Sequence, residues 1–320
     1  MEPLILALDF GGTKHSAAVL VRGGASWSGR ERVFSPRDAD AAYDLRTMFA
    51  LARRLLQGEQ PAAIGVSFGG PVDFSSGVVR LSHHVPGWED TPLKKMLEAE
   101  FGAPAAVDND ANAAALGEHR YGAGKGRSSL LYMTVSTGVG GGWVLEGRPW
   151  RGREGMAGEI GHMVVDPNGP LCLCGKRGCV ERLASGVYMA QDARLHLQEG
   201  TAPPGGGHIL LDLARGNPDA ITGKLLSQAA AKGDVLAWEV LARGAWALGT
   251  GIGNCANLIN PDLFILGGGV TKAGERYWEE IRKTARATAL PEVHFDILPA
   301  ALGDDAPLWG AAALAEACLQ

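Results

Sequence analysis

One histidine and three cysteines occur at a spacing typical of metal ligands. Nine residues separate His162 from Cys172, and Cys174 and Cys179 follow closely. Three thiolates and one imidazole fill the four positions of a tetrahedral Zn²⁺ site. Such a site leaves no position for an activated water, so we expect this zinc to be structural. The alternative is three unligated thiols in a glycine-rich turn with a core histidine nearby.

Two carboxylates belong to the same cysteine-rich segment. Glu159 lies three residues before His162, and Glu181 lies two residues after Cys179. If one ring nitrogen of His162 binds zinc, the other N–H becomes a hydrogen-bond donor in a fixed direction. Carboxylates accept hydrogen bonds from hydroxyl groups. The segment therefore favours recognition of a polyol, although Glu181 could also be an ordinary surface charge.

Two glycine-rich turns follow apolar segments. The first, Asp9 to Lys14, places a carboxylate, two glycines, a hydroxyl and an ammonium in one turn. Glycines let backbone N–H groups approach phosphate oxygens, and Asp9 could hold a hydrated Mg²⁺. The spacing fits neither a Walker A loop nor a dinucleotide fingerprint, and a plain hairpin turn is the alternative. The second turn, Ser136 to Gly142, suggests that the pair grips a triphosphate.

Three consecutive polar residues, Asp108, Asn109 and Asp110, stand where an apolar strand leads into a helix. Helix capping accounts for one of them, or two. The remaining acidic group is a candidate for the carboxylate that orients an attacking hydroxyl and takes its proton in phosphoryl transfer. The residues alone leave Asp108 and Asp110 as alternatives.

The composition excludes several classes of protein. With 30 Lys and Arg against 35 Asp and Glu among 320 residues, the net charge is −5, which disfavours a nucleic-acid partner. No apolar run is long enough for a membrane span and no signal-type segment is present, so we expect a cytoplasmic protein. Five cysteines, an odd number, favour reduced thiols or metal ligands over disulfides.

Strands and helices alternate along the chain, which predicts an α/β fold. Apolar segments predict strands at 4–10, 16–22, 62–68, 105–107, 129–135, 143–146, 263–270 and 294–298. Helical patterns occur at 41–57, 92–100, from 109, and at 180–198, 219–231, 235–257, 273–288 and 307–319. The order strand, glycine turn, strand occurs twice. We interpret this repeat as a duplicated phosphate-handling lobe, with the boundary and a cleft near 110–126.

These motifs together resemble the ROK family of sugar kinases and sugar-responsive repressors, within the actin and hexokinase-like superfamily. The resemblance covers nearly the whole chain and is carried by both glycine turns, Gly267-Gly268-Gly269 and the segment 158–181. It implies two ribonuclease-H-like lobes with a central cleft for ATP and sugar. The small lobe would span 1–118 and be completed by 306–320. The large lobe would span 119–305 and carry the zinc-binding loop 158–181.

The resemblance also implies roles for single residues. It makes Asp110 the general base and gives His162, Cys172, Cys174 and Cys179 to the structural Zn²⁺. The expected contacts to ATP and Mg²⁺ are Asp9, Gly11, Gly12, Thr13, Lys14, Thr137, Gly138, Gly140, Gly267, Gly268 and Gly269. The expected contacts to the sugar are Gly69, Gly70, Asn109, Asp110, Glu159, His162 and Glu181.

The activity implied is ATP-dependent phosphorylation of a hexose, with glucose at its 6-hydroxyl as the first choice, by a homodimer or homotetramer. N-acetylglucosamine, N-acetylmannosamine, mannose, fructose and allose are alternatives. Family glucokinases often carry Asn two residues before Pro-Gly-Trp, where this chain has His84, so the preferred sugar stays open. A non-catalytic sugar sensor is another alternative. A repressor is disfavoured, since only eight residues precede Asp9.

Overall fold

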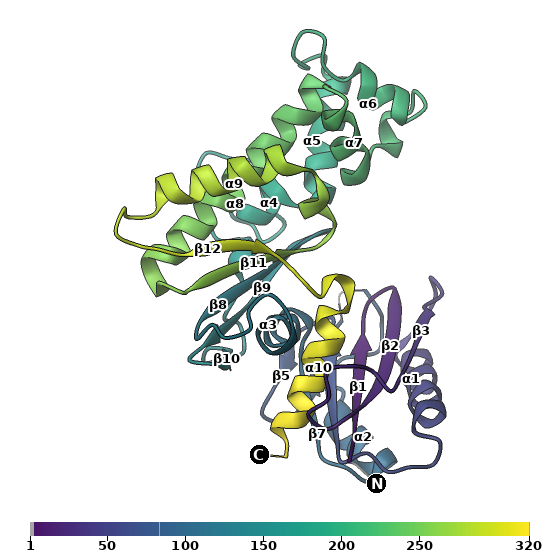
Figure 1. The fold of residues 1–320 in the computed structure, drawn as a ribbon. Coiled ribbons are helices and arrows are strands. Elements are labelled where there is room, and N and C mark those ends of the chain that lie inside the picture. Colours follow the sequence, from purple (N-terminus) through teal and green to yellow (C-terminus); the bar gives the residue numbers. More distant parts are fainter. Residues whose placement is uncertain (1–2, 83, 320) are drawn as a thin grey trace. The chain divides into compact units, whose positions relative to one another are not determined.

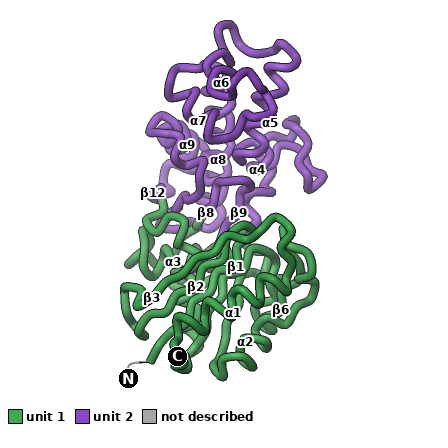
Figure 2. The backbone as a smooth tube through the Cα atoms, turned by 90° about the vertical axis from the view of Figure 1, so that its right-hand side faces the viewer, with its two compact units in different colours: residues 1–132, 142–158, 300–320 green, residues 133–141, 159–299 purple. Residues whose placement is uncertain are grey.

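The computed structural model describes residues 3–82 and 84–319. The chain divides into two compact units, each assembled from separate segments (Figure 2). Unit 1 contains Met1–Tyr132, Gly142–Gly158 and Ala300–Gln320, and unit 2 contains Met133–Gly141 and Glu159–Pro299. Residues 119–132, 142–158 and 300–305, which we assigned to the large lobe, belong to unit 1 in this division. The two functional lobes with limits 1–118 plus 306–320 and 119–305 stay a prediction.

The sheet of unit 1 brings several strand ends to one edge. It contains β1 (Leu4–Phe10), β2 (Lys14–Val21), β3 (Gly29–Phe34), β4 (Ala63–Phe68) and β7 (Ala105–Asn109), in the order β3-β2-β1-β4-β7. Strands β1, β4 and β7 are parallel, and Asp9 pairs with Ser67, which pairs with Asp108. Ligands of open α/β sheets commonly bind at the carboxyl ends of such strands. This edge is therefore where Asp9 and the Asp108 to Asp110 segment meet.

Helices cover both faces of this sheet because successive side chains of a strand point to opposite faces. Leu6 and Leu8 pack with residues of α1 (Ala41–Leu56) and α2 (Leu93–Phe101). Ile5 and Ala7 pack with α10 (Ala306–Ala317) on the other face (Figure 1). Helix α3 (Asp110–Tyr121) packs along α10. Glycines permit this close packing: a Cβ on Gly65 would lie 1.7 Å from the carbonyl oxygen of Ala311.

The second sheet repeats the topology of the first: its first, second and third strands along the chain take the places of β1, β2 and β3. It contains β8 (Leu130–Val135), β9 (Val139–Leu145), β10 (Arg148–Trp150), β11 (Leu263–Gly267) and β12 (Asp296–Pro299), in the order β10-β9-β8-β11-β12. In each sheet the outer pair on one side is antiparallel and the outer pair on the other side is parallel. This repeated topology agrees with the duplication inferred from the glycine turns. A small hairpin pairs β5 (Val72–Asp73) with β6 (Val78–Val79).

The remaining helices belong to unit 2. They are α4 (Val180–Ala184), α5 (Gly186–Gln198), α6 (His208–Leu213), α7 (Gly223–Ala231), α8 (Val235–Ile259) and α9 (Glu275–Thr288). Helix α8 has 25 residues and packs along α9 (Figure 1). Short 3₁₀ turns occur at Ile160–His162, Pro218–Ala220, Gly269–Lys272 and Gly303–Asp305. Within the described ranges, no helix is both long enough and apolar enough to cross a membrane.

The α/β class is confirmed, and the structure corrects several predicted elements. The helix predicted over 180–198 is two helices, because Ser185 ends α4 and its hydroxyl caps α5, accepting from the Tyr188 N–H at 3.4 Å. Strand β3 was not predicted because its sequence, GRERVF, is mostly polar. Helix α6 was also missed. Strand β9 begins at Val139, four residues earlier than predicted, and so includes Gly140.

Candidate functional site

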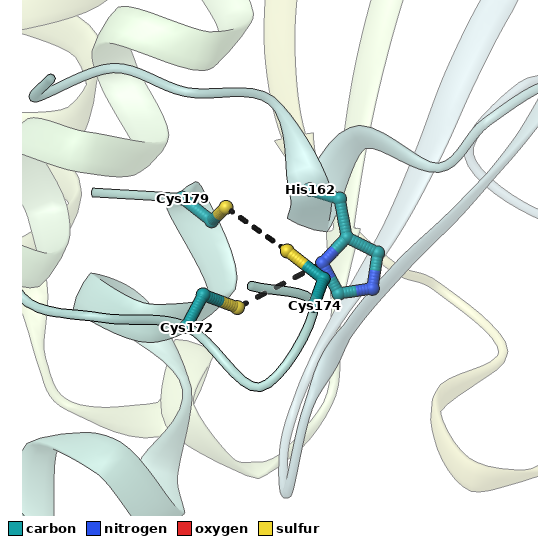
Figure 3. A group of neighbouring side chains, drawn as sticks. All are labelled: His162, Cys172, Cys174 and Cys179. Atoms are coloured by element: carbon teal, nitrogen blue, oxygen red, sulfur yellow. Dashed lines mark hydrogen bonds between the residues drawn. The ribbon is translucent and has the colours of Figure 1, made fainter. Parts of the chain in front are cut away.

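The four predicted zinc ligands come together in unit 2. Their ligand atoms, one each from His162, Cys172, Cys174 and Cys179, all lie within 4.8 Å of one another (Figure 3). The Nδ1 of His162 is 3.9 Å from the Cys172 sulfur, and the sulfurs of Cys174 and Cys179 are 3.6 Å apart. Ligands bound tetrahedrally to zinc at about 2.3 Å stand roughly 3.8 Å from one another. The cluster therefore fits a closed Zn²⁺ site.

The side chain of His162 has two different environments. Its Nδ1 faces the cysteine sulfurs, and the other ring nitrogen, Nε2, points away from them (Figure 3). Metal binding through Nδ1 would leave the proton on Nε2 and make that nitrogen a directed donor. Glu159, three residues earlier, accepts a backbone hydrogen bond from the His162 N–H at 3.1 Å and has an exposed side chain. Both residues are thus fixed by the backbone of one 3₁₀ turn.

Glu181 lies in the first turn of α4, two residues after the ligand Cys179. Its Oε2 accepts a hydrogen bond of 2.9 Å from the backbone N–H of Val139. The same oxygen would be 2.7 Å from a Cβ on Gly138. Glu181 is therefore in contact with the second glycine-rich turn, a relationship that the sequence analysis did not predict. Nothing in the sequence marks this pair, since its members are 42 positions apart.

The structure brings Gly69, Gly70, Asn109 and Asp110 together in unit 1. Asn109 caps α3 by accepting from the Ala111 N–H at 2.9 Å, and its Nδ2 donates to the carbonyl of Gly70 at 3.1 Å. A Cβ on Gly69 would lie 3.9 Å from Oδ2 of Asp110. Asp110 is a residue of intermediate exposure at the start of the helix. This arrangement places a carboxylate beside two backbone positions that carry no side chain.

Asp108 and Asp110 have different environments. Asp108 is 2% exposed, and its Oδ2 accepts from Nε of Arg151 at 2.8 Å and pairs with Nη2 at 2.6 Å. Its Oδ1 accepts from Nδ2 of Asn112 at 3.1 Å. Arg151 also stacks on the ring of Phe74, 3.4 Å from the centroid. Asp108 is thus fully engaged in structural contacts, which leaves Asp110 as the carboxylate available for chemistry.

Two carboxyl groups at this edge have raised pKa values. Burial raises the pKa of Asp9 to about 6, although a hydrogen bond of 2.9 Å from the Ser67 hydroxyl acts in the opposite direction and the nearby Asp110 raises the pKa further. Burial also raises the pKa of Asp110 above its ordinary value. In both groups removal from water is the main cause, so the charged form of each carboxyl group is disfavoured. A cation bound next to Asp9 would favour its charged form.

The first glycine turn is short and partly open. The N–H of Gly11 donates to the Lys14 carbonyl at 3.1 Å, and Thr13 is exposed at the tip. A Cβ on Gly12 would come within 3.0 Å of the His84 side chain, which therefore lies against this turn. The ammonium group of Lys14 forms a long ion pair of 3.8 Å with Asp304. The turn thus closes on itself through the Gly11 N–H and carries one ammonium group.

The second and third glycine turns are neighbours in unit 2. The second turn closes with a 2.9 Å hydrogen bond from the Ser136 N–H to the Gly138 carbonyl, with Thr137 exposed between them. Gly140, predicted in this turn, lies in β9 instead. Gly267 ends β11, and Gly268 follows at φ +92° with no room for a side chain, because a Cβ would lie 2.3 Å from the Val135 carbonyl oxygen. Gly269 begins the next 3₁₀ turn.

The ROK family model matches residues 5–318, and the chain belongs to the ROK family. The glucokinase of Streptomyces coelicolor is 36% identical over 318 residues, which cover 98% of this chain and 97% of that protein. The crystal structure of the ROK hexokinase from Thermus thermophilus matches with a TM-score of 0.84 and 34% identity over 99% of both chains. The ROK family glucokinase from Streptomyces griseus, crystallised with glucose and AMPPNP, matches with a TM-score of 0.80 and 36% identity, covering 98% and 99% of the two chains. The fold is the actin and hexokinase-like fold.

Proposed function

We propose that the chain is an ATP-dependent sugar kinase that phosphorylates glucose at its 6-hydroxyl. The observation that carries this proposal is the difference between Asp108 and Asp110. Arg151 and Asn112 engage Asp108, whereas Asp110 is a residue of intermediate exposure at the start of α3, beside Gly69. Glucokinases at 36% identity over nearly the full length support the choice of substrate.

Asp110 acts as the general base. It accepts the proton of the attacking sugar hydroxyl as the γ-phosphoryl group leaves ATP, which typically contributes about 10²- to 10⁴-fold in rate. Its raised pKa brings its basicity closer to that of a base working near neutral pH. Asn109 positions Asp110 through the helix cap and through its bond to the Gly70 carbonyl.

The glycine-rich turns hold the nucleotide. Gly11, Gly12, Thr13 and Lys14 line phosphate oxygens from one turn, and Thr137 and Gly138 contact them from the other. Gly140 supports the second turn from β9, and Gly267, Gly268 and Gly269 contact the adenosine. Asp9 holds Mg²⁺, whose charge, when bound, offsets that of the phosphates.

The sugar is recognised by hydrogen bonds. Asn109, Glu159, Glu181 and Nε2 of His162 contact hydroxyl groups, and Gly69 and Gly70 approach the ring through their backbone. The zinc ligands His162, Cys172, Cys174 and Cys179 hold the segment that carries three of these side chains. A bound zinc ion supplies structural order there and no reacting water. We further propose a cytoplasmic homodimer or homotetramer.

A coupled ADP-release assay tests the proposal. Protein, ATP and Mg²⁺ are combined with glucose, mannose, fructose, allose, N-acetylglucosamine or N-acetylmannosamine, and the Asp110→Asn variant is the blank. We expect the highest kcat/KM with glucose. If another hexose is turned over in preference to glucose, that hexose is the substrate. His84 is then the first residue to exchange. Sugar-dependent thermal stabilisation without turnover of any sugar would overturn the kinase and favour a sugar sensor.

A further inference from the structure

Three contacts join the second glycine turn of unit 2 to the segment that carries the zinc ligands and to α4 and α5, the helices at its end. The N–H of Gly186 donates to the Ser136 carbonyl at 2.8 Å. Gly161 packs so closely on Val139 that a Cβ would lie 2.1 Å from its carbonyl oxygen. Oε2 of Glu181 accepts the Val139 N–H at 2.9 Å. The turn proposed to bind phosphate is therefore in direct contact with the segment proposed to bind the sugar.

Glu181 differs from the other two contacts because it ends in a carboxylate with two oxygens. One oxygen, Oε2, is committed to the Val139 N–H. The other, Oε1, accepts no hydrogen bond from the residues that the structure describes, and the side chain is only half-buried. The backbone of α4 is fixed by the ligand Cys179 before it and by the Val180 N–H, which donates to the Met163 carbonyl at 3.0 Å. Oε1 and Oε2 belong to one planar carboxylate, so a ligand that binds Oε1 acts on the Val139 N–H through the same group.

We propose that Glu181 couples sugar binding to nucleotide binding, an inference that rests on the proposed function. A sugar hydroxyl that donates to Oε1 fixes the orientation of the carboxylate and keeps Oε2 on the Val139 N–H. The turn from Ser136 to Val139 is then held in one conformation before phosphate oxygens reach its N–H groups. Each ligand thus lowers the ordering cost of the other, and the coupling is reciprocal by thermodynamic necessity.

Calorimetric titration of the intact protein measures this coupling. Glucose is titrated in the absence and presence of saturating Mg-AMPPNP, and Mg-AMPPNP in the absence and presence of saturating glucose. We expect each ligand to tighten the other by the same factor, about fivefold or more. Two ligands that bind with independent affinities would overturn the inference and leave the kinase intact. Failure of the wild-type protein to bind either ligand would instead overturn the proposed function.

Gly138→Ala is the most informative variant because it displaces the Glu181 carboxylate without changing its chemistry. The added Cβ would lie 2.7 Å from Oε2, and the flexible end of Glu181 can move away without unfolding the protein. We expect the coupling factor to fall to about 1. The glucose dissociation constant in the absence of nucleotide should rise less than in a variant that lacks the carboxylate, because Glu181 keeps both of its oxygens. If Gly138→Ala kept the wild-type coupling factor, Glu181 would not be the residue that couples glucose binding to nucleotide binding.

Glu181→Met decides the question if Gly138→Ala no longer binds nucleotide. Methionine has similar length and no charged oxygens, so both hydrogen bonds are lost and the coupling factor should fall to about 1 while glucose binds at least about tenfold more weakly. Glu292→Gln, at an exposed position of unit 2, serves as the control and should keep the wild-type factor. Retention of wild-type coupling in Glu181→Met would overturn the inference.

Discussion

Arg151 binds Asp108 through two nitrogens that share one carboxylate oxygen, at 2.6 Å from Nη2 and 2.8 Å from Nε. The pair is one residue away from Asn109 and two from Asp110. It fixes the end of β7, from which α3 and its first carboxylate begin. We therefore expect the two acidic residues of this short motif to have separate roles, Asp108 structural and Asp110 chemical, and the two roles can be tested separately.

Asp110→Asn should abolish most turnover and leave the fold intact. The amide cannot take a proton from the sugar hydroxyl, so kcat should fall by about 10²-fold or more. The dissociation constant for glucose should change little, because the amide still forms hydrogen bonds. Steady-state kinetics and calorimetry on the same preparation measure both quantities. A variant with near-native kcat would remove Asp110 from its role.

Asp108→Asn should reduce the stability of the protein more than its turnover, which is the opposite of Asp110→Asn. The amide leaves the largely buried Arg151 without a charged partner, which should cost about 1–3 kcal/mol in the free energy of unfolding. Urea denaturation followed by tryptophan fluorescence gives this quantity. The loss of kcat should be smaller than in Asp110→Asn. Unchanged stability combined with the larger loss of kcat would reverse the two assignments.

Cys174→Ser should release the metal. Serine does not replace a thiolate as a zinc ligand, so the zinc content of the purified protein should fall from about one per chain towards zero. The disordered segment should raise the KM for glucose through Glu159 and His162. Atomic absorption measures the metal, and Cys318→Ser, outside the cluster, is the control that should keep it. Equal zinc in both variants would contradict the Cys₃His site.

Asp9→Asn should stabilise the ligand-free protein at neutral pH. The pKa of Asp9 is about 6 in the folded protein and near 3.8 in an unfolded chain, so folding binds a proton between these values. The stability of the ligand-free protein therefore falls as pH rises from about 4 to 6, and stays lower above that range. At pH 8 the neutral amide removes this penalty, an effect of about 1–3 kcal/mol, while at pH 4 the gain should vanish.

The same Asp9→Asn variant should lose affinity for Mg-AMPPNP, because the carboxylate proposed to hold Mg²⁺ is gone. Thermal melts at pH 4 and pH 8, with and without the nucleotide, separate the two effects. Asp38→Asn, at an exposed carboxylate, should show neither of them. A lower melting temperature for Asp9→Asn at pH 8 without ligand would contradict the uncompensated charge.

Gly65→Ala tests the close packing of α10 on β4. The new Cβ would lie 1.7 Å from the Ala311 carbonyl oxygen, so strand and helix must separate. Overpacking of this kind typically costs about 1–3 kcal/mol. Gly29→Ala is the control, because its Cβ would meet side chains and no backbone atom: the flexible end of Leu55 at 3.1 Å and Cγ2 of Val19 at 3.5 Å. Equal unfolding midpoints for the two variants in urea would argue against this packing.

Sequence patterns were informative wherever the chemistry is local. The spacing of His162, Cys172, Cys174 and Cys179 placed all four in one cluster because a short segment contains them. Contacts between distant residues left no such pattern. Arg151 and Asp108 are 43 residues apart and Glu181 and Val139 are 42 apart, so only the folded chain identifies these pairs.

Element boundaries were least predictable where tertiary contacts override local preference. The polar strand β3 forms because it pairs with β2 at the sheet edge, and its composition gives no apolar signal. The helix predicted over 180–198 looked continuous, but the Glu181 and Ser185 region turns towards the Ser136 to Val139 turn. The glycines at 140–142 resembled an extended turn, whereas Gly142 is required within β9 because a Cβ would lie 2.5 Å from the Ala111 carbonyl oxygen.

Helix α10 covers one face of the sheet that begins the chain, with Leu308 and Ala311 packed on Ile5 and Ala7. These partners are more than three hundred positions apart in the sequence. A ribosome therefore finishes the whole of residues 159–299 before that face can be covered. In the meantime its apolar side chains are exposed to the translation machinery and to chaperones, and the loop that must close is among the longest that the chain permits. Maturation of the first sheet is accordingly a late event in the synthesis of this protein.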